Sequence, residues 1–215
     1  MVQLTSAPLL SLVALAAAAP FDGNLNNGLT SRQAGAGNCK AMMVIFARGT
    51  TEPGTLGLIA GPPLQAALKA KMGGGNVQFQ GVDYPADVPG FLAGGDAQGS
   101  KTMAQMVTQA VAACPNSDVV MVGYSQGGQL VHNAAQQLDS TTAAKVSSAV
   151  IFGDPDNPKP IPGIQNQKVI CANGDLICAG QAVILAPHLS YGSNAGEAAD
   201  FIASNAKAGG AAAAN

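Results

Sequence analysis

Three segments of the chain are apolar almost without interruption, and they predict strands that are buried on both faces. They are residues 40–47, 118–123 and 146–152. Continuous apolar runs of this length are typical of a parallel sheet that is covered on both sides. Two weaker patterns, at residues 77–82 and 168–171, predict further strands, the first because polar and apolar residues alternate along it.

Four other segments have the character of helices. Residues 62–72 open with Pro62-Pro63 and run into three consecutive glycines, which are common signals for the start and the end of a helix. The other three are residues 100–113, 126–138 and 194–206. Apolar side chains recur on one face of the first and last of these, as expected for helices that pack on a core.

The order of these elements indicates the fold class. Strands that alternate with helices form a parallel sheet with helices on both faces, so the chain is predicted to be an α/β protein in three layers. Ligands of such sheets bind at the carboxyl ends of the strands. The segments expected at this functional edge begin at Arg48, Tyr84, Tyr124, Gly153 and Ala172.

The two ends of the chain are predicted to lie outside the folded domain. Residues 1–19 carry a short apolar stretch that ends in small residues, and we expect them to be an export signal, although no Lys or Arg precedes that stretch. A short buried helix is the alternative. Residues 20–32 are expected to be a pro-segment or flexible arm, residues 33–207 one catalytic domain, and residues 208–215 a disordered low-complexity tail. The protein is therefore expected to be secreted.

The cysteine pattern favours two disulfide bonds. Behind an export signal, an even number of cysteines, here four, favours pairing, and three connectivities are possible. Cys171 and Cys178 enclose a turn-forming Asn-Gly-Asp run and are the natural local pair, which leaves Cys39 for Cys114. The chain has only two histidines and no Cys-x-x-Cys motif, so we expect neither a metal nor another cofactor.

The charge of the chain narrows the class of partner. Only 10% of the residues are charged, the formal net charge is −2, and there is no basic run. Nucleic acid and an anionic membrane are therefore disfavoured as partners. A weakly charged surface suits contact with a neutral polymer, and we expect the protein to act as a monomer.

Residues 123–127, Gly-Tyr-Ser-Gln-Gly, match the Gly-x-Ser-x-Gly turn that carries the nucleophile of many hydrolases. The motif requires a strand before it and a helix after it, and both are predicted here. In this setting the serine hydroxyl stands clear of the sheet, and the positive end of the helix faces a developing oxyanion. Ser125 is therefore the predicted nucleophile, and a purely structural turn is the alternative.

A serine nucleophile needs a base, and the chain offers two histidines. His132 would lie two helical turns from Ser125, where its ring cannot reach back, and we expect it to be a surface or partly buried residue. His188 follows the last predicted strand and satisfies the chain order of nucleophile, acid and histidine that is typical of this class. His188 is therefore the predicted base.

The acid that orients this histidine should lie between the nucleophile and the base. The candidates are Asp139, Asp154, Asp156 and Asp175. Asp139 ends a helix at the wrong edge of the sheet. Position alone permits Asp154 and Asp156, although Asp154 also fits a turn before proline. Asp175 is preferred because a disulfide around it would hold the carboxylate in place against the imidazole.

The loop after the first strand, residues 48–52, is expected to complete an oxyanion hole. Its glycine lets the backbone approach the substrate, and Thr50 follows directly. The predicted donors are the backbone N–H groups of Thr50 and Gln126, with the Thr50 hydroxyl as a further donor.

Taken together, these motifs resemble those of the fungal cutinases. The matching segments are 47–52 (ARGTTE), 114–115 (CP), 123–128 (GYSQGG), 171–178 (CANGDLIC) and 187–192 (PHLSYG). The resemblance implies a small α/β-hydrolase with a five-stranded parallel sheet and an open active site. It places the family's acid on Asp175, its oxyanion residues on Thr50 and Gln126, and its disulfides on Cys39–Cys114 and Cys171–Cys178. Cutinases often have serine where this chain has Thr50.

The resemblance further implies a crevice between two apolar loops, residues 85–92 and 182–189. The expected substrate-binding residues are Tyr124, Val88, Phe91, Leu92, Val183, Ile184 and Leu189. Ordinary core positions are the alternative for each apolar side chain in the two loops.

The residues predict a secreted serine esterase that acts through an acyl-enzyme, and the resemblance to the cutinases implies that it hydrolyses cutin and short-chain esters. An acetylxylan esterase on the same fold is the nearest alternative, although such relatives tend to have more cysteines and a more polar crevice. A non-catalytic, surface-binding secreted protein is the alternative of another class, and it would be expected to lack one of the catalytic residues.

Overall fold

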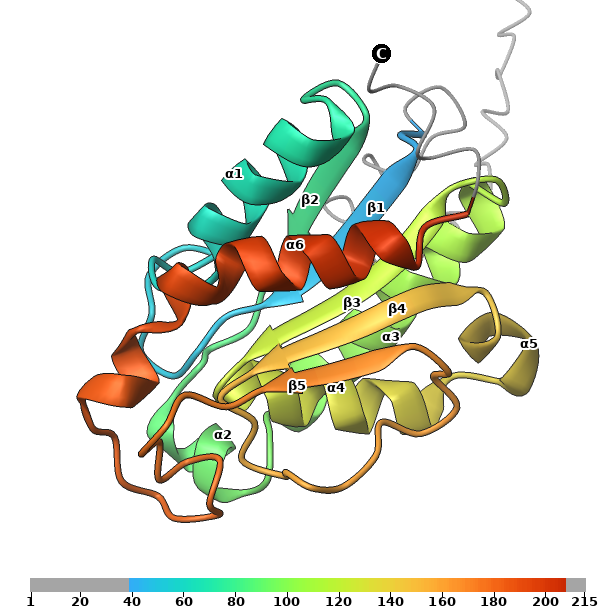
Figure 1. Cartoon of the computed structure of the whole chain (residues 1–215). Helices are drawn as coiled ribbons and strands as arrows, with labels where there is room; N and C mark the ends of the chain where they lie inside the picture. The colour runs from blue at the N-terminus through green and yellow to red at the C-terminus, as the bar shows by residue number, and fades with distance from the viewer. Residues whose placement is uncertain (1–38, 208–215) are drawn as a thin grey trace, which may run out of the picture. The chain divides into compact units, whose positions relative to one another are not determined.

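Five parallel strands form the single sheet of the computed structural model, which describes residues 39–207 (Figure 1). The sheet order is β2-β1-β3-β4-β5, and all neighbouring strands run parallel. The strands are β1 (Met42–Ala47), β2 (Val77–Gly81), β3 (Asp118–Tyr124), β4 (Val146–Phe152) and β5 (Gln167–Ile170). All five predicted strands are confirmed to within about two residues. The predicted export signal, arm and tail lie outside the described residues, and their boundaries stay predictions.

The helices cover both faces of the sheet. They are α1 (Gly61–Met72), α2 (Val88–Leu92), α3 (Ala97–Ala113), α4 (Gln126–Gln137), α5 (Ser140–Ala143) and α6 (Ala195–Ser204), with 3-10 turns η1 (Ala186–Leu189) and η2 (Tyr191–Asn194). Helices α1 and α6 pack on one face, and α3 and α4 on the other (Figure 1). The predicted three-layer α/β architecture is confirmed.

The two faces of β1 explain why its sequence is apolar throughout. Met43 and Ile45 point into the core beneath α3 and α4, whereas Val44 and Phe46 point into the core beneath α1 and α6. A strand that is buried on both sides cannot alternate between polar and apolar residues. This is the physical basis of the continuous apolar runs in the central strands.

Two short helices differ from the sequence-based expectation. Residues 88–92 were expected to be loop, yet they form α2, because the Asp87 side chain accepts a hydrogen bond from Gly90 N and Pro89 occupies the first turn. Helix α5 has only four residues and no apolar period to reveal it. Helix α3 also begins at Ala97 rather than at residue 100, with the Asp96 side chain as its cap.

Both disulfide bonds have the expected connectivity. Cys39–Cys114 joins the segment before β1 to the end of α3, and Cys171–Cys178 closes a short loop after β5. None of the described helices is long and apolar enough to cross a bilayer.

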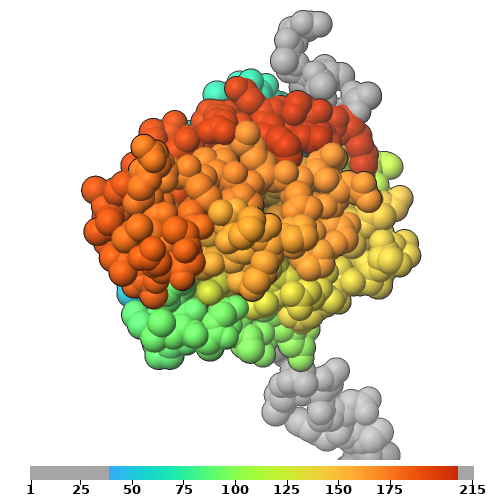
Figure 2. All heavy atoms as spheres, turned by 60° about the horizontal axis from the view of Figure 1, so that its bottom comes forward, coloured from blue at the N-terminus to red at the C-terminus, as the bar shows by residue number. Residues whose placement is uncertain are grey.

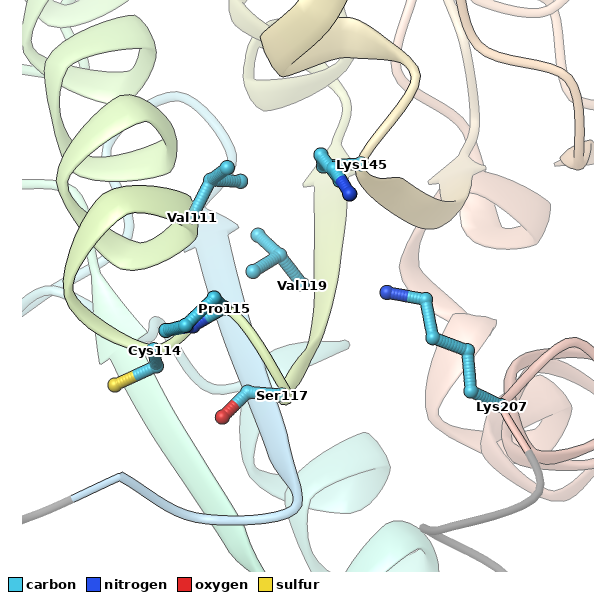
Figure 3. A pocket seen from close by; sticks show the side chains of 7 residues that line it. All are labelled: Val111, Cys114, Pro115, Ser117, Val119, Lys145 and Lys207. Carbon is cyan, nitrogen blue, oxygen red and sulfur yellow. The ribbon is translucent and has the colours of Figure 1, made fainter.

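The two edges of the sheet differ in what they carry. At the amino-terminal edge of β3 there is a small hollow of about 30 Å³. It is lined by Lys145 and Lys207, together with Val119 and the Cys114-Pro115 turn (Figure 3). At the carboxyl edge lie the segments after β1, β3, β4 and β5, toward which the strand arrows point in Figure 1. The predicted catalytic residues are all at this second edge.

Candidate active site

Ser125 occupies a strained turn between β3 and α4. Its backbone has φ 55° and ψ −123°, a conformation that L-residues rarely adopt. A Cβ atom on Gly123 would collide with the carbonyl of Gly127, and one on Gly127 would collide with the carbonyl of Ala47. The two glycines of the motif are therefore required by close backbone approach, and the turn leaves Ser125 at the amino terminus of α4.

A chain of hydrogen bonds joins Ser125, His188 and Asp175. Nε2 of His188 lies 2.9 Å from Oγ of Ser125, and Nδ1 of His188 lies 2.8 Å from Oδ2 of Asp175. All three side chains are buried. The tautomer with a proton on Nδ1 donates to the carboxylate and leaves Nε2 free to accept the serine proton, which is the arrangement required for nucleophilic catalysis.

The Asp175 carboxylate accepts hydrogen bonds from two groups besides His188. Its Oδ2 accepts a second hydrogen bond, of 2.5 Å, from the hydroxyl of Tyr191, and its Oδ1 accepts one of 2.9 Å from the backbone N–H of Ile177. Burial alone would raise the pKa of Asp175, but these hydrogen bonds and the one to His188 outweigh it and lower the pKa below its ordinary value. The carboxylate is thus kept ionised beside the imidazole.

The ring of His188 is enclosed from two further sides. The Tyr124 ring stacks on it with centroids 5.2 Å apart, and the Tyr124 hydroxyl donates to the His188 carbonyl at 2.8 Å. A Cβ atom on Gly153 would come within 2.7 Å of the imidazole, so the backbone after β4 lies directly against the ring. Tyr124 was expected to contact substrate, but it is 3% exposed and its ring packs against His188 and Tyr191.

The predicted oxyanion residues are joined by a side-chain contact. Nε2 of Gln126 donates to Oγ1 of Thr50 at 2.9 Å and to the carbonyl of Asp87 at 2.7 Å. A hydroxyl that accepts a hydrogen bond still has its own proton to donate, so the Thr50 hydroxyl can serve as a donor beside the backbone N–H groups. The side chain of Gln126 therefore orients Thr50.

Glu52 shapes the loop that carries Thr50. Its Oε1 accepts hydrogen bonds from the N–H groups of Leu58 and Ile59, and its Oε2 accepts one from Gly49. The Arg48 side chain ties the same loop to the segment after β2, through the carbonyl of Tyr84. Sequence reasoning did not identify Glu52 as a positioning residue, because its partners are backbone groups that no motif marks.

Apolar side chains gather around this edge of the sheet. The large apolar side chains that are exposed among the described residues are Leu58, Val88, Leu92, Val183, Ile184, Leu185 and Leu189. They lie in three segments, after β1, β2 and β5. Figure 2 shows the segment near residue 90 (green) beside the segment near residues 175–190 (orange) on this face. Leu58 and Leu185 were not among the predicted substrate residues, and Phe91 is only partly exposed.

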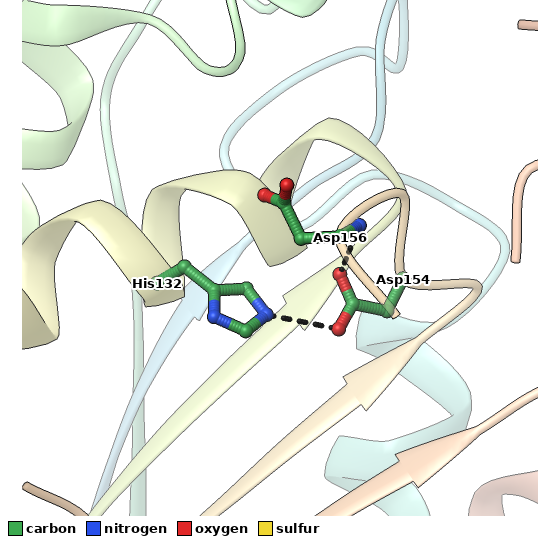
Figure 4. Close-up of side chains that lie close together, drawn as sticks. All are labelled: His132, Asp154 and Asp156. Atoms are coloured by element: carbon green, nitrogen blue, oxygen red, sulfur yellow. Dashed lines mark hydrogen bonds and ion pairs between the residues drawn. The ribbon is translucent and has the colours of Figure 1, made fainter. Parts of the chain in front are cut away.

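A second histidine–aspartate pair lies outside the hydrogen-bond chain of Ser125, His188 and Asp175. Nε2 of His132 is 2.9 Å from Oδ2 of Asp154, and Oδ1 of Asp154 accepts from the N–H of Asp156 (Figure 4). His132 is therefore buried rather than a surface residue, because α4 turns it toward the loop after β4. Asp154 is engaged here and not at His188, which leaves Asp175 as the acid in contact with the predicted base.

The same three side chains are the described group closest to a metal-binding arrangement. Their potential ligand atoms lie within 4.8 Å of one another. Each already has a partner, however, because His132 pairs with Asp154 and Asp156 pairs with Lys159 at 2.9 Å. We interpret the group as a clamp that fixes the loop after β4.

Comparisons with known proteins identify the family of this chain. The sequence model of the cutinase family matches residues 38–206. A cutinase of Botryotinia fuckeliana is 57% identical over 166 residues, which cover 76% of this chain and 82% of that protein. A cutinase of Pyrenopeziza brassicae is 54% identical, covering 80% and 85% of the two chains.

Solved structures have the same fold. Trichoderma reesei cutinase in complex with a phosphonate inhibitor matches with a TM-score of 0.76 and 40% identity, covering 79% of this chain and 78% of that one. An acetylxylan esterase matches with a TM-score of 0.65 at 24% identity, over 79% of this chain and all of that one, a likeness of fold alone.

The sheet order and the serine turn after β3 define an α/β-hydrolase. Identity of this extent, spread over most of the chain, also settles the family. The chain belongs to the cutinase family and is a carboxylic ester hydrolase.

Proposed function

We propose that the protein is a serine esterase that cleaves cutin and short-chain esters, with Ser125 as nucleophile, His188 as general base and Asp175 as the orienting acid. The observation that carries the proposal is the continuous hydrogen-bond chain from Ser125 Oγ through His188 to Asp175 Oδ2. Such a chain is the working arrangement of acyl-transfer enzymes with a serine nucleophile.

In this mechanism Oγ of Ser125 attacks the ester carbonyl while Nε2 of His188 takes its proton. The negative charge that develops on the carbonyl oxygen is stabilised by the N–H groups of Thr50 and Gln126 and by the Thr50 hydroxyl. The tetrahedral intermediate collapses as His188 donates the proton to the departing alcohol oxygen, leaving an acyl group on Ser125. Water, deprotonated by His188, then releases the carboxylic acid.

The exposed apolar side chains around the site support a water-insoluble, neutral substrate. Leu58 and Leu92 are each 69% exposed, and Ile184 is 57% exposed. Exposed apolar patches mark surfaces that contact another apolar phase. We therefore include Val88, Leu92, Val183, Ile184 and Leu189 in the proposed contact surface, and add Leu58. Cutin, the polyester on which the related enzymes are named to act, has this chemistry.

The proposal includes secretion and action as a monomer. Secretion is supported by the export-signal pattern of residues 1–19 and by the two disulfide bonds, since disulfides persist in oxidising compartments. Terminal sequencing of the protein from culture medium would locate the cleavage point, and light scattering would give the mass in solution. Retention of the whole chain inside the cell would contradict the first part, and a dimer the second.

The decisive experiment replaces Ser125 with alanine. The S125A variant should fold normally, lose hydrolysis of p-nitrophenyl butyrate and fail to react with a fluorophosphonate probe. Ser204→Ala is the matched control, because Ser204 is an exposed serine at the end of α6. Probe labelling or residual turnover in folded S125A would exclude Ser125 as the nucleophile. A wild type that does not react with the probe would instead indicate a non-catalytic protein.

A substrate panel separates cutinase from acetylxylan esterase activity. The exposed apolar side chains of the proposed contact surface predict faster hydrolysis of a cutin film than of acetylated xylan, whose acetyl groups are attached to a polar polysaccharide. Rates on both polymers, with p-nitrophenyl butyrate as the common reference, test this ranking. A preference for acetylated xylan would favour the alternative and leave the Ser125 assignment untouched.

A further inference from the structure

A polar hollow of about 250 Å³ lies on the side of α4, outside the proposed active site. It is lined by Gly94, which follows α2, and by residues of α4 and of the loop after β4, namely His132, Asn133, Gln136, Asp156, Lys159 and Pro160. His132 is seven residues beyond Ser125 on α4, about 10 Å along the helix axis. We call this space the His132 hollow. None of its lining residues is assigned a part in the proposed ester hydrolysis.

One ring nitrogen of His132 is left over for a ligand. Nε2 is engaged with Asp154, whereas Nδ1 points away from Asp154 and has no hydrogen-bond partner among the described residues (Figure 4). The described atoms that lack a partner and are also closed to solvent belong to four other residues, so Nδ1 keeps access to solvent. His132 is only 4% exposed and lines the hollow, so this access is through the hollow. Buried polar groups almost always have a partner, and here a ligand can supply it.

Asp154 determines what Nδ1 can bind. Its carboxylate oxygen accepts the hydrogen bond, so the proton of the neutral imidazole is on Nε2 and Nδ1 is an acceptor. The second oxygen of Asp154 accepts from the N–H of Asp156, which fixes the carboxylate. His132 therefore presents an uncharged acceptor of fixed direction to the hollow.

The other side chains of the hollow offer both donors and acceptors. Asn133 donates from Nδ2 to the carbonyl of Gly94, which leaves its Oδ1 as an acceptor. The carboxamide of Gln136 is exposed and can act in either way. Asp156 and Lys159 pair at 2.9 Å, so their charges compensate, and the ammonium keeps further N–H groups to donate.

We propose that the His132 hollow binds one sugar ring of a neutral saccharide. A hydroxyl both donates and accepts, so adjacent ring hydroxyls can satisfy Nδ1 of His132, the two carboxamides and Lys159 at the same time. Pro160 is the one apolar side chain of the described lining, which disfavours an aliphatic chain. The compensated Asp156–Lys159 pair disfavours a simple anion or cation. The volume lies just below the range of pockets for drug-sized ligands, as expected for a single ring.

The site is an anchor beside the catalytic edge. The loop after β4 joins the two places, because the backbone of Gly153 lies against His188 and Asp156 lines the hollow. A saccharide in the hollow holds the protein on a surface that contains polysaccharide and leaves Ser125 free. The inference goes beyond the proposed function and does not depend on it.

The two histidines of the chain provide the test. In protein labelled with ¹⁵N-histidine, with EDTA present to exclude metal ions, cellohexaose, xylohexaose and mannohexaose are titrated in turn. For at least one of them, the Nδ1 signal of His132 should shift and saturate while the His188 signals stay in place. No shift with any of the three at about 10 mM, where a site with a millimolar Kd is mostly filled, overturns the proposal. An equal shift of His188 overturns it as well, because the saccharide would then lie at the catalytic edge.

Gln136→Ala is the variant, and Gln137→Ala is its matched control. Both glutamines are exposed neighbours on α4, but only Gln136 lines the hollow. Q136A should raise the Kd of the saccharide about fivefold, the value of one hydrogen bond, and Q137A should not. Equal affinity in the two variants overturns the assignment to the hollow. Tighter binding of an oligogalacturonate than of the neutral saccharides overturns it too, since the site would then select anions.

A methyl glycoside of the sugar that binds distinguishes the two sources of this ligand. Either result supports the site, since equal affinity identifies a free sugar and tighter binding of the hexasaccharide identifies a polymer chain. Hydrolysis of p-nitrophenyl butyrate should be equal in wild type, Q136A and Q137A. Loss of saccharide binding leaves Ser125-dependent hydrolysis intact, whereas turnover in S125A would defeat the proposed function and leave the saccharide site untouched.

Discussion

The hydroxyl of Tyr191 donates a hydrogen bond to Oδ2 of Asp175, the same oxygen that faces Nδ1 of His188. Tyr191 is fully buried, and burial raises the pKa of its hydroxyl, so it remains a protonated donor. The hydroxyl also accepts from the backbone N–H of Ala172 at 3.0 Å. Tyr191 thereby fixes the carboxylate relative to the segment after β5, and we assign it as a positioning residue.

Replacing Tyr191 with phenylalanine should lower kcat about fivefold to tenfold and leave KM unchanged, because the carboxylate loses one hydrogen bond that holds it toward the imidazole while the substrate surface is untouched. Steady-state kinetics on p-nitrophenyl butyrate would measure both constants, with urea unfolding to confirm the fold. A kcat equal to that of wild type would mean that Ile177 and the disulfide loop position Asp175 without Tyr191.

The lowered pKa of Asp175 predicts how its contribution to stability depends on pH. In the unfolded chain this carboxyl titrates near its ordinary value of about 4, and in the folded protein at a lower pH. The unfolded state therefore binds the proton first. The stabilisation from Asp175 is complete above the unfolded pKa and is lost as the pH falls through the folded pKa.

Wild type and Asp175→Asn should accordingly differ most in free energy of unfolding near pH 6, and the gap should shrink as the pH falls from about 5 to about 2. Urea titrations at a series of pH values would give both curves. A gap that stays constant down to pH 2 would show that Asp175 carries no stabilising charge in the folded protein.

The two disulfide bonds should differ in what their removal does. Cys171–Cys178 encloses few residues, and chain entropy assigns it about 2–3 kcal/mol of stability, whereas the longer Cys39–Cys114 loop is assigned about 4–5 kcal/mol. Only the shorter loop contains Asp175. Replacing Cys171 and Cys178 by serine should therefore lower kcat per folded molecule despite the smaller loss of stability.

The matched double variant, C39S/C114S, should lose more stability and retain the kcat of wild type when measured at low temperature, where it stays folded. Thermal unfolding and active-site titration with a fluorophosphonate separate the two effects. Equal kcat in both double variants would argue that the loop does not depend on its disulfide to place Asp175.

The sequence predicted the strands because a strand buried on both faces must be apolar at every position, as β1 is. It predicted Ser125 from the turn motif and His188 from chain order. Chain order left four candidate acids, and Asp175 was preferred because of the disulfide around it and the resemblance to the cutinases. It did not predict α2, where Pro89 and Gly90 are ordinarily loop signals and the Asp87 cap decides the outcome.

What the sequence could not reveal are the partners of buried polar side chains. The contact between Gln126 and Thr50 joins residues that are 76 positions apart, and that between His132 and Asp154 joins residues 22 apart. Neither pair has a spacing that sets it apart from chance. Such contacts follow from which loops meet at the carboxyl edge of the sheet, and only the folded chain specifies that.

The Thr50 hydroxyl, held by Gln126, should contribute to catalysis and not to substrate binding. Thr50→Val preserves the shape and the backbone N–H but removes the hydroxyl donor, and it should lower kcat on the order of 10²-fold with little change in KM. Thr50→Ser keeps the donor and should remain within about threefold of wild type. Equal kcat in T50V and T50S would restrict the oxyanion hole to backbone donors.

Breaking the His132–Asp154 pair should destabilise the fold strongly, because the pair is closed to solvent and the side chain left behind stays buried. Replacing His132 with alanine leaves a buried carboxylate without its partner, which typically costs about 3–5 kcal/mol, and Asp154→Ala leaves a buried imidazole. Removing both should cost less than the sum of the single changes, since neither partner then remains unpaired. Urea unfolding of the two single variants and the double variant measures this coupling.

Activity provides the second readout of the same pair. Asp154 directly follows Gly153, whose backbone lies against the His188 ring. Loosening this loop should therefore lower kcat in H132A. Titration with a fluorophosphonate measures the fraction of folded, reactive sites, so that kcat can be given per folded molecule. The exposed pair Lys71–Asp200, between α1 and α6, is the control, and K71A should change neither quantity appreciably. If the losses in free energy of unfolding of the His132 and Asp154 variants are additive and kcat is unchanged, the prediction is wrong. The two buried side chains would then act independently of each other.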